Sequence, residues 1–91
     1  GCEIYGEVEN CVLSDNVTIE EGAIVKNCII FSDCHIKKGA KLDYVIMDSG
    51  VCVQENAEVI GELEKITLIG SNVTIGKGKK VVSGDIVNED V

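Results

Sequence analysis

The sequence predicts an all-β domain in which short parallel strands wind around a central core. Twenty-five of its 91 residues are Val or Ile, whereas Leu, Ala and Met together number eight. β-Branched side chains lose rotamer freedom in a helix but pack well on a pleated surface, so this composition favours strands. The chain also matches itself when it is shifted by about 17 residues, and a fixed period of this kind is typical of repeat architectures.

The period is clearest in the small and aliphatic residues. The chain has three alanines, Ala23, Ala40 and Ala57, and the spacing between neighbours is one period in both cases. Aliphatic residues follow the same shift in four columns: Ile19, Ile36, Val53; Val8, Val25, Leu42, Val59; Leu13, Ile30, Met47; and Val12, Ile29, Ile46. Turn-forming residues follow it in two more: Asn16, Asp33, Gly50 and Gly22, Gly39, Asn56. We expect the members of each column to stack on one another.

Each period divides into three short units. The leading aliphatics are six, six and five residues apart, as in Leu13, Ile19, Val25 and Ile30. Gly, Asn and Asp tolerate the positive φ of a tight corner, so each unit can form one strand and one corner. Three units close a triangle, with the leading aliphatic and the small residue four positions later pointing inward. The predicted fold is a single-stranded left-handed parallel β-helix of triangular coils of about 17 residues, stacked at about 4.8 Å.

The repeat also predicts the domain organisation. It runs from Val8 to Val59 and resumes at residues 72–75, which repeat the letters of 16–19. We expect a loop insertion at about 61–66, roughly four to five coils, and a polar cap or tail at about 82–91. Residues 1–91 are thus one domain, and the opening glycine suggests a fragment of a larger chain.

Composition argues against several classes of partner. Sixteen acidic residues against eight basic ones give a net charge of −8, and aromatic residues make up 3%. Nucleic acid binding needs basic and stacking groups, so it is not expected. No apolar run is long enough for a membrane helix. The five cysteines form an odd set without a CxxC pair, which favours reduced thiols and a cytoplasmic protein.

Four lysines are the candidate binding residues. Lys37, Lys38 and Lys41, with Lys26 nearby, could form an anion site for a phosphorylated effector. The alternative is that charges of opposite sign stack in columns, such as Glu9 next to Lys26, and only stabilise the register. The sequence leaves both interpretations open.

The single histidine, His35, shares a column with Thr18 and Cys52 at an outward position. One histidine cannot build a zinc site of three histidines, but it could serve as the general base of an acyltransferase. The alternative is an ordinary surface histidine, because the sequence shows no group that orients its ring. Phosphate loops, nucleophile elbows and dinucleotide fingerprints are absent from the sequence. We therefore expect no catalytic residue and no metal site in these 91 residues.

Three of the five cysteines are expected in the core. Cys11, Cys28 and Cys34 occupy inward positions, where a free thiol behaves as a small hydrophobe. Cys52 is expected to point outward.

The amino-acid sequence of the repeats resembles that of a known family. Residues 3–13, 17–30 and 42–48 are similar to the C-terminal β-helix domain of bacterial glucose-1-phosphate adenylyltransferase, also called ADP-glucose pyrophosphorylase. The last segment is most similar to the companion subunit that accompanies the catalytic subunit in some bacteria. The resemblance extends from Gly1 to about Ile75.

The resemblance implies a larger enzyme that makes ADP-glucose and pyrophosphate from ATP and glucose 1-phosphate, with Mg²⁺, for glycogen synthesis. This domain would be its non-catalytic scaffold, in contact with an N-terminal catalytic domain and with partners in a homo- or hetero-tetramer, and would help to bind allosteric effectors. Two alternatives stay open: a hexapeptide-repeat acyltransferase that uses His35, and the β-helix tail of another sugar-nucleotide transferase, such as mannose-1-phosphate guanylyltransferase.

Overall fold

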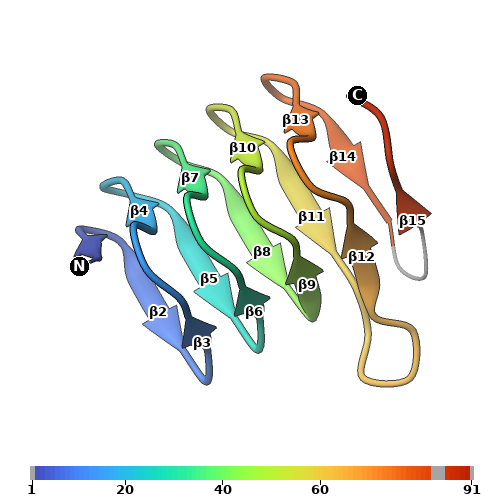
Figure 1. Ribbon diagram of the computed structural model, residues 1–91, viewed down its shortest axis with the longest axis horizontal. Helices are drawn as coiled ribbons and strands as arrows, with labels where there is room; N and C mark the ends of the chain where they lie inside the picture. The colour runs from blue at the N-terminus through green and yellow to red at the C-terminus, as the bar shows by residue number, and fades with distance from the viewer. Residues whose placement is uncertain (1, 83–85, 91) are drawn as a thin grey trace.

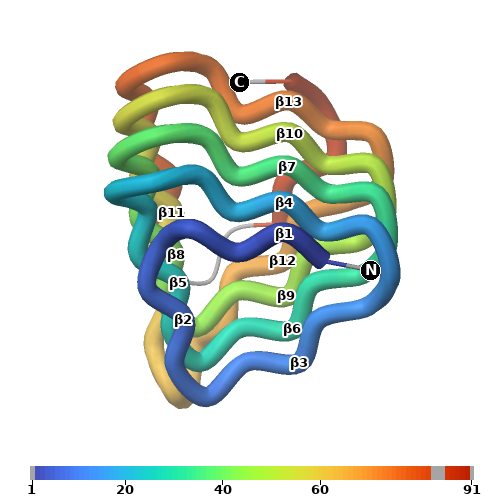
Figure 2. Tube along the Cα trace, turned by 90° about the vertical axis from the view of Figure 1, so that its left-hand side faces the viewer, coloured from blue at the N-terminus to red at the C-terminus, as the bar shows by residue number. Residues whose placement is uncertain are grey.

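The computed structural model describes residues 2–82 and 86–90, and in it the chain is a triangular β-helix (Figure 1). Short strands form three parallel five-stranded sheets, one on each side of the triangle. Seen from the N-terminal end, the chain runs counter-clockwise as it recedes from the viewer, so the coil is left-handed (Figure 2). The predicted fold class is confirmed.

Every third strand joins the same sheet. Sheet A contains β1 (Glu3–Ile4), β4 (Thr18–Ile19), β7 (His35–Ile36), β10 (Cys52–Val53) and β13 (Thr74–Ile75). Sheet B contains β2 (Glu7–Glu9), β5 (Ile24–Lys26), β8 (Lys41–Asp43), β11 (Glu58–Ile60) and β14 (Lys80–Val81). Sheet C contains β3 (Val12–Leu13), β6 (Ile29–Ile30), β9 (Val45–Met47), β12 (Thr67–Ile69) and β15 (Ile86–Val87).

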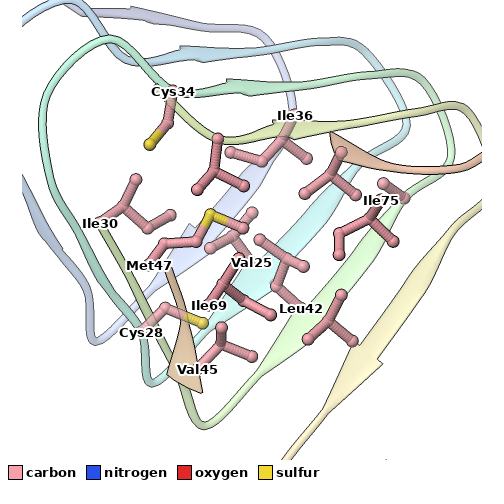
Figure 3. Packing of buried hydrophobic residues seen from close by; sticks show 14 of the residues in the cluster. Val25, Cys28, Ile30, Cys34, Ile36, Leu42, Val45, Met47, Ile69 and Ile75 are labelled. Atoms are coloured by element: carbon pink, nitrogen blue, oxygen red, sulfur yellow. The ribbon is translucent and has the colours of Figure 1, made fainter. Parts of the chain in front are cut away.

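The strand register reproduces the predicted columns. On sheet A, Ile36 pairs with Ile19 on one side and with Val53 on the other. The alanines Ala23, Ala40 and Ala57 are each fully buried. Aliphatic side chains from all three sheets meet in the interior (Figure 3). The core is thus a set of stacked layers in which each residue contacts its equivalents one period away.

Two of the three corners follow the predicted turn columns. Asn16, Asp33, Gly50 and Asn72 occupy one corner with φ between 58° and 75°. The other has positive φ at Gly22, Gly39, Asn56 and Gly78. The third corner, between sheets B and C, is turned by a single residue with positive φ: Asn10, Asn27 and Tyr44, at 53°, 53° and 51°. The residues of this corner were not predicted as a turn column, because tyrosine rarely adopts a positive φ.

Residues 61–66 lie between β11 and β12. Ile60 is in register with Asp43 and Thr67 with Val45. Residues 61–66 therefore occupy the corner that the single residue Tyr44 forms one coil earlier. Backbone hydrogen bonds between Glu62 and Lys65, both 3.0 Å, close the loop. Gly61 begins it where a Cβ atom would overlap the carbonyl oxygen of Tyr44, so only glycine fits there without a shift.

The stretch 82–91, where we expected a cap or tail, includes β15, which pairs with β12. Asp90 Oδ1 accepts a hydrogen bond of 2.7 Å from the backbone N–H of Thr74. Residues 83–85 and 91 of this stretch, and residue 1, lie outside the described residues. Within the described part of the chain, no helix has the length and apolar character needed to cross a membrane.

Candidate functional site

Two of the four candidate lysines lie on sheet B. Lys26 on β5 is in register with Asp43, and its Nζ lies 3.9 Å from Glu9 Oε2. Lys41 on β8 is in register with Ile24 and Glu58. Glu58 forms its ion pair with Lys80 on the far side, at 3.6 Å. Lys26 therefore has a carboxylate partner on the preceding strand, and Lys41 a carboxylate in register on the next.

The other two lysines follow β7 at the corner between sheets A and B. Lys37 is half-buried and Lys38 is exposed. Both lower the pKa of the Glu20 carboxyl group, Lys37 through its charge and Lys38 through its backbone N–H. The four lysines thus fall into two pairs, on either side of a corner, with a carboxylate beside each pair. This arrangement can attract an anion, but the anion must compete with those carboxylates.

A hydrogen-bonded pair that the sequence analysis missed lies next to Lys37. His35 Nε2 and Glu20 Oε2 are 2.5 Å apart, and their side chains are 42% and 29% exposed. The hydrogen bond from His35 lowers the pKa of Glu20; partial desolvation opposes this, and the charges of His35 and Lys37 and the backbone of Lys38 add to it. The expectation that nothing orients the His35 ring is therefore wrong. Glu20 precedes His35 by one period minus two positions, which places it diagonally across from His35 on the same side of the prism.

This pair has the elements of a general base. When the Nε2–H group donates this hydrogen bond to Glu20, Nδ1 carries the lone pair that can accept a proton from a bound substrate. Cys52 follows His35 in the column, and its Sγ accepts a hydrogen bond of 3.4 Å from Gln54 Nε2. Three shallow grooves on the described surface include neither His35 nor any of the four lysines.

The buried cysteines behave as the sequence predicts. Cys28 and Cys34 are each 1% exposed, and Cys11 is half-buried. Burial raises the pKa of the Cys28 thiol to about 12 and raises that of Cys34 as well. These groups therefore stay protonated, and their S–H groups donate to the carbonyl oxygens of Lys26 at 3.0 Å and Asp48 at 3.1 Å. Among the described residues, no group of three acidic, cysteine or histidine side chains is placed to hold a metal ion.

The fold and its filled interior define a hexapeptide-repeat β-helix, whose outer sides and ends are the surfaces open to other molecules. The family model described as "GlmU-like, C-terminal hexapeptide" matches residues 1–66 of the 91. The chain therefore belongs to this family of C-terminal hexapeptide domains. No solved structure matches it.

Proposed function

We propose that the chain is the non-catalytic C-terminal scaffold and regulatory domain of a sugar-nucleotide transferase, specifically a glucose-1-phosphate adenylyltransferase. The family match over residues 1–66 carries the proposal, because this family consists of GlmU-like C-terminal hexapeptide domains. The resemblance of residues 3–13, 17–30 and 42–48 to the adenylyltransferase supports the narrower assignment. The catalytic domain of the parent enzyme would hold Mg²⁺ and the nucleotide.

The structure suits a role in positioning. The interior is closed by buried aliphatic residues, so the domain offers flat outer sides and two ends for contact. Each strand is held by hydrogen bonds to the neighbouring coils, which keeps these sides rigid. A rigid prism can hold a catalytic domain and neighbouring subunits at fixed distances. The corner at Lys37 and Lys38 would receive the phosphate group of an effector.

The test compares the full-length enzyme with the isolated domain. Full-length enzyme should form ADP-glucose and pyrophosphate from ATP, glucose 1-phosphate and Mg²⁺, whereas residues 1–91 alone should form none. Turnover by the isolated chain would refute the non-catalytic role. If the full-length enzyme instead makes GDP-mannose from GTP and mannose 1-phosphate, the adenylyl assignment is wrong and the scaffold role stands.

A regulatory role requires that the corner lysines, Lys37 and Lys38, bind the effector. Changing Lys37 and Lys38 together to Ala should leave turnover without effector unchanged and remove the response to a sugar-phosphate effector. The matched control changes Lys77 and Lys79, two exposed lysines on the last coils, and should keep that response. An unchanged response in the first variant would exclude this anion site.

The second candidate is an acyltransferase, and the contact between His35 and Glu20 is the observation that favours it. His35 Nδ1 would take the proton from an acceptor amine or hydroxyl as that group attacks the thioester carbonyl of an acyl-CoA. The C–S bond then breaks, the thiolate leaves as CoA after it takes up the proton, and the acyl group stays on the acceptor. Acyl transfer that falls at least ~100-fold in His35→Ala would support this function. Absence of transfer in the unmodified protein would exclude it.

A further inference from the structure

The outer face of sheet C carries an unbroken row of aliphatic side chains. We call this row the sheet C stripe: Val12, Ile29, Ile46, Leu68 and Ile86, which are in register from the first strand of the sheet to the last. Ile29 and Leu68 are each 39% exposed, and the two end residues, Val12 and Ile86, are 62% and 67% exposed. The stripe therefore presents continuous apolar surface along the length of the prism.

The fold itself does not require these residues to be apolar. The same outward positions on sheet A are Glu3, Thr18, His35, Cys52 and Thr74. On sheet B they are Glu7, Ile24, Lys41, Glu58 and Lys80. Since polar and charged side chains occupy most of these positions on two sides of the same coil, the apolar third side needs another cause. Contiguous apolar surface of this kind marks an interaction site.

A groove of about 260 Å³ runs beside the stripe. Phe31, Asp48, Gly70 and Asn88 line it together with the stripe residues Ile46, Leu68 and Ile86. Gly70 has no side chain, and the Asn88 side chain on the next strand lies over it, since a Cβ atom at position 70 would come 2.9 Å from Asn88 Oδ1. Phe31, at the end of the second strand, is 42% exposed. The same face thus carries an exposed ring and a hollow two strands further along.

We propose that sheet C docks against sheet C of a second copy of this chain, with the two prisms antiparallel. A two-fold axis along the strand direction at β9 would place Ile46 opposite its own copy and Ile29 opposite Leu68. The second and fourth strands lie at equal distances from β9. The same rotation therefore brings the Phe31 ring of one copy to the groove beside Gly70 and Asn88 of the other. Such a self-complementary patch is the requirement for a closed dimer.

The uncharged stripe and the area of one side are the arguments for a second copy as the occupant. The chain carries a net charge of −8, but none of it lies in the stripe, so the matching surface is uncharged and aliphatic. This chain supplies such a surface itself. The prism measures 28 × 24 × 21 Å. One side therefore covers roughly 500 Å², and two sides bury about 1,000 Å², the lower bound for a specific interface.

Asp48 is the charged side chain that limits this contact. It lines the groove at β9, where the two copies would bring their carboxylates together across the axis. Its Oδ1 accepts a 2.7 Å hydrogen bond from the backbone N–H of Ser49. We therefore expect a reversible dimer that Asp48→Asn tightens, because the substitution removes the repulsion.

This inference deepens the proposed scaffold role by naming the surface through which subunits meet. The inference rests on the proposed function only in stating what the dimer is for, and the dimer itself does not depend on it. The experiment below measures mass and not turnover, so the dimer and the enzymatic assignment can fail separately.

The first experiment is sedimentation equilibrium of residues 1–91 over a concentration series. We expect a monomer–dimer equilibrium, with a dissociation constant that Ile29→Lys raises at least ~tenfold, because an unpaired charge would be buried in the contact. The matched control is Ile60→Lys on sheet B, since Ile60 is also 39% exposed. Both variants gain one positive charge, so overall repulsion changes equally. A monomer at every concentration, or equal dissociation constants for the two variants, would overturn the proposal.

The second experiment tests the orientation by disulfide trapping. Cys2, Cys11 and Cys52, the exposed and half-buried cysteines, are first changed to Ser. Ile29→Cys chains are then mixed with Leu68→Cys chains. The antiparallel arrangement predicts a disulfide between positions 29 and 68, which mass spectrometry identifies. Links of 29 to 29 and 68 to 68 in its place would show that the two-fold axis runs along the prism and would refute the antiparallel arrangement.

Discussion

Ile36→Ala should be among the most destabilising substitutions in the chain. Ile36 is fully buried between Ile19 and Val53 in the same column. Removing three carbon atoms costs about 2.4 kcal/mol at roughly 0.8 kcal/mol for each. Hydrogen bonds on both sides hold the neighbouring strands one period apart, so they cannot collapse into the space. The cavity that stays adds about 1–2 kcal/mol, for a total near ~4 kcal/mol.

Urea unfolding followed by circular dichroism measures this loss as a lower midpoint at an unchanged slope. Ile60→Ala is the matched control, because it removes the same atoms from a side chain that is 39% exposed. We expect that control to cost about 1 kcal/mol or less. A loss below about 1 kcal/mol for Ile36→Ala, or an equal loss for both variants, would refute the layered core.

Three further predictions concern the core and its corners. Ala40→Leu should destabilise by about 1–3 kcal/mol in urea unfolding, because Ala40 is fully buried where the walls converge and leaves no room for a larger side chain. Burial raises the pKa of Cys28 from 9.0 to about 12, so the stability that its neutral thiol contributes is present below pH 9 and lost as the pH rises toward 12. Cys28→Ala should flatten that alkaline decline, and an unchanged pH profile would contradict it. Tyr44→Asn should stabilise by about 0.5–1 kcal/mol, because Asn tolerates the φ of 51° better, whereas Tyr5→Asn, outside the corners, should not.

The sequence predicts the core well because stacking is in register. A fixed period decides which residues lie next to one another, so residues one period apart in the sequence stack in the core. Three buried residues show this directly: Ala23, Ala40 and Ala57. The third corner was missed because its signal is weaker. Asn10 and Asn27 point to it, but Tyr44 has a bulky side chain that disfavours positive φ, so the pattern breaks at the coil before the insertion.

Side-chain contacts across a sheet are harder to predict than columns. A shift of one period compares residues directly above one another and therefore relates His35 to Thr18 and Cys52. The contact that matters at His35 is diagonal, to Glu20 two positions short of a full period, and depends on side-chain length and rotamer. The same holds for Glu58, which has Lys41 and Lys80 in register on either side and forms its ion pair with Lys80.

Glu20 takes part in both candidate functions, and changing it distinguishes between them. Its carboxylate orients His35 through their hydrogen bond. The same negative charge partly cancels the positive potential that Lys37 and the backbone N–H of Lys38 would present to an anion. Glu20→Gln should therefore act with opposite signs. If the corner is an anion site, removing this charge strengthens the binding of inorganic phosphate, which a chemical-shift titration of residues 1–91 measures. If His35 is a general base, the same change weakens acyl transfer, because the amide stabilises a charged imidazole less well than a carboxylate does. Unaltered phosphate binding in Glu20→Gln would exclude the corner as an anion site, since a carboxylate that interacts with Lys37 must weaken the binding of an anion to it.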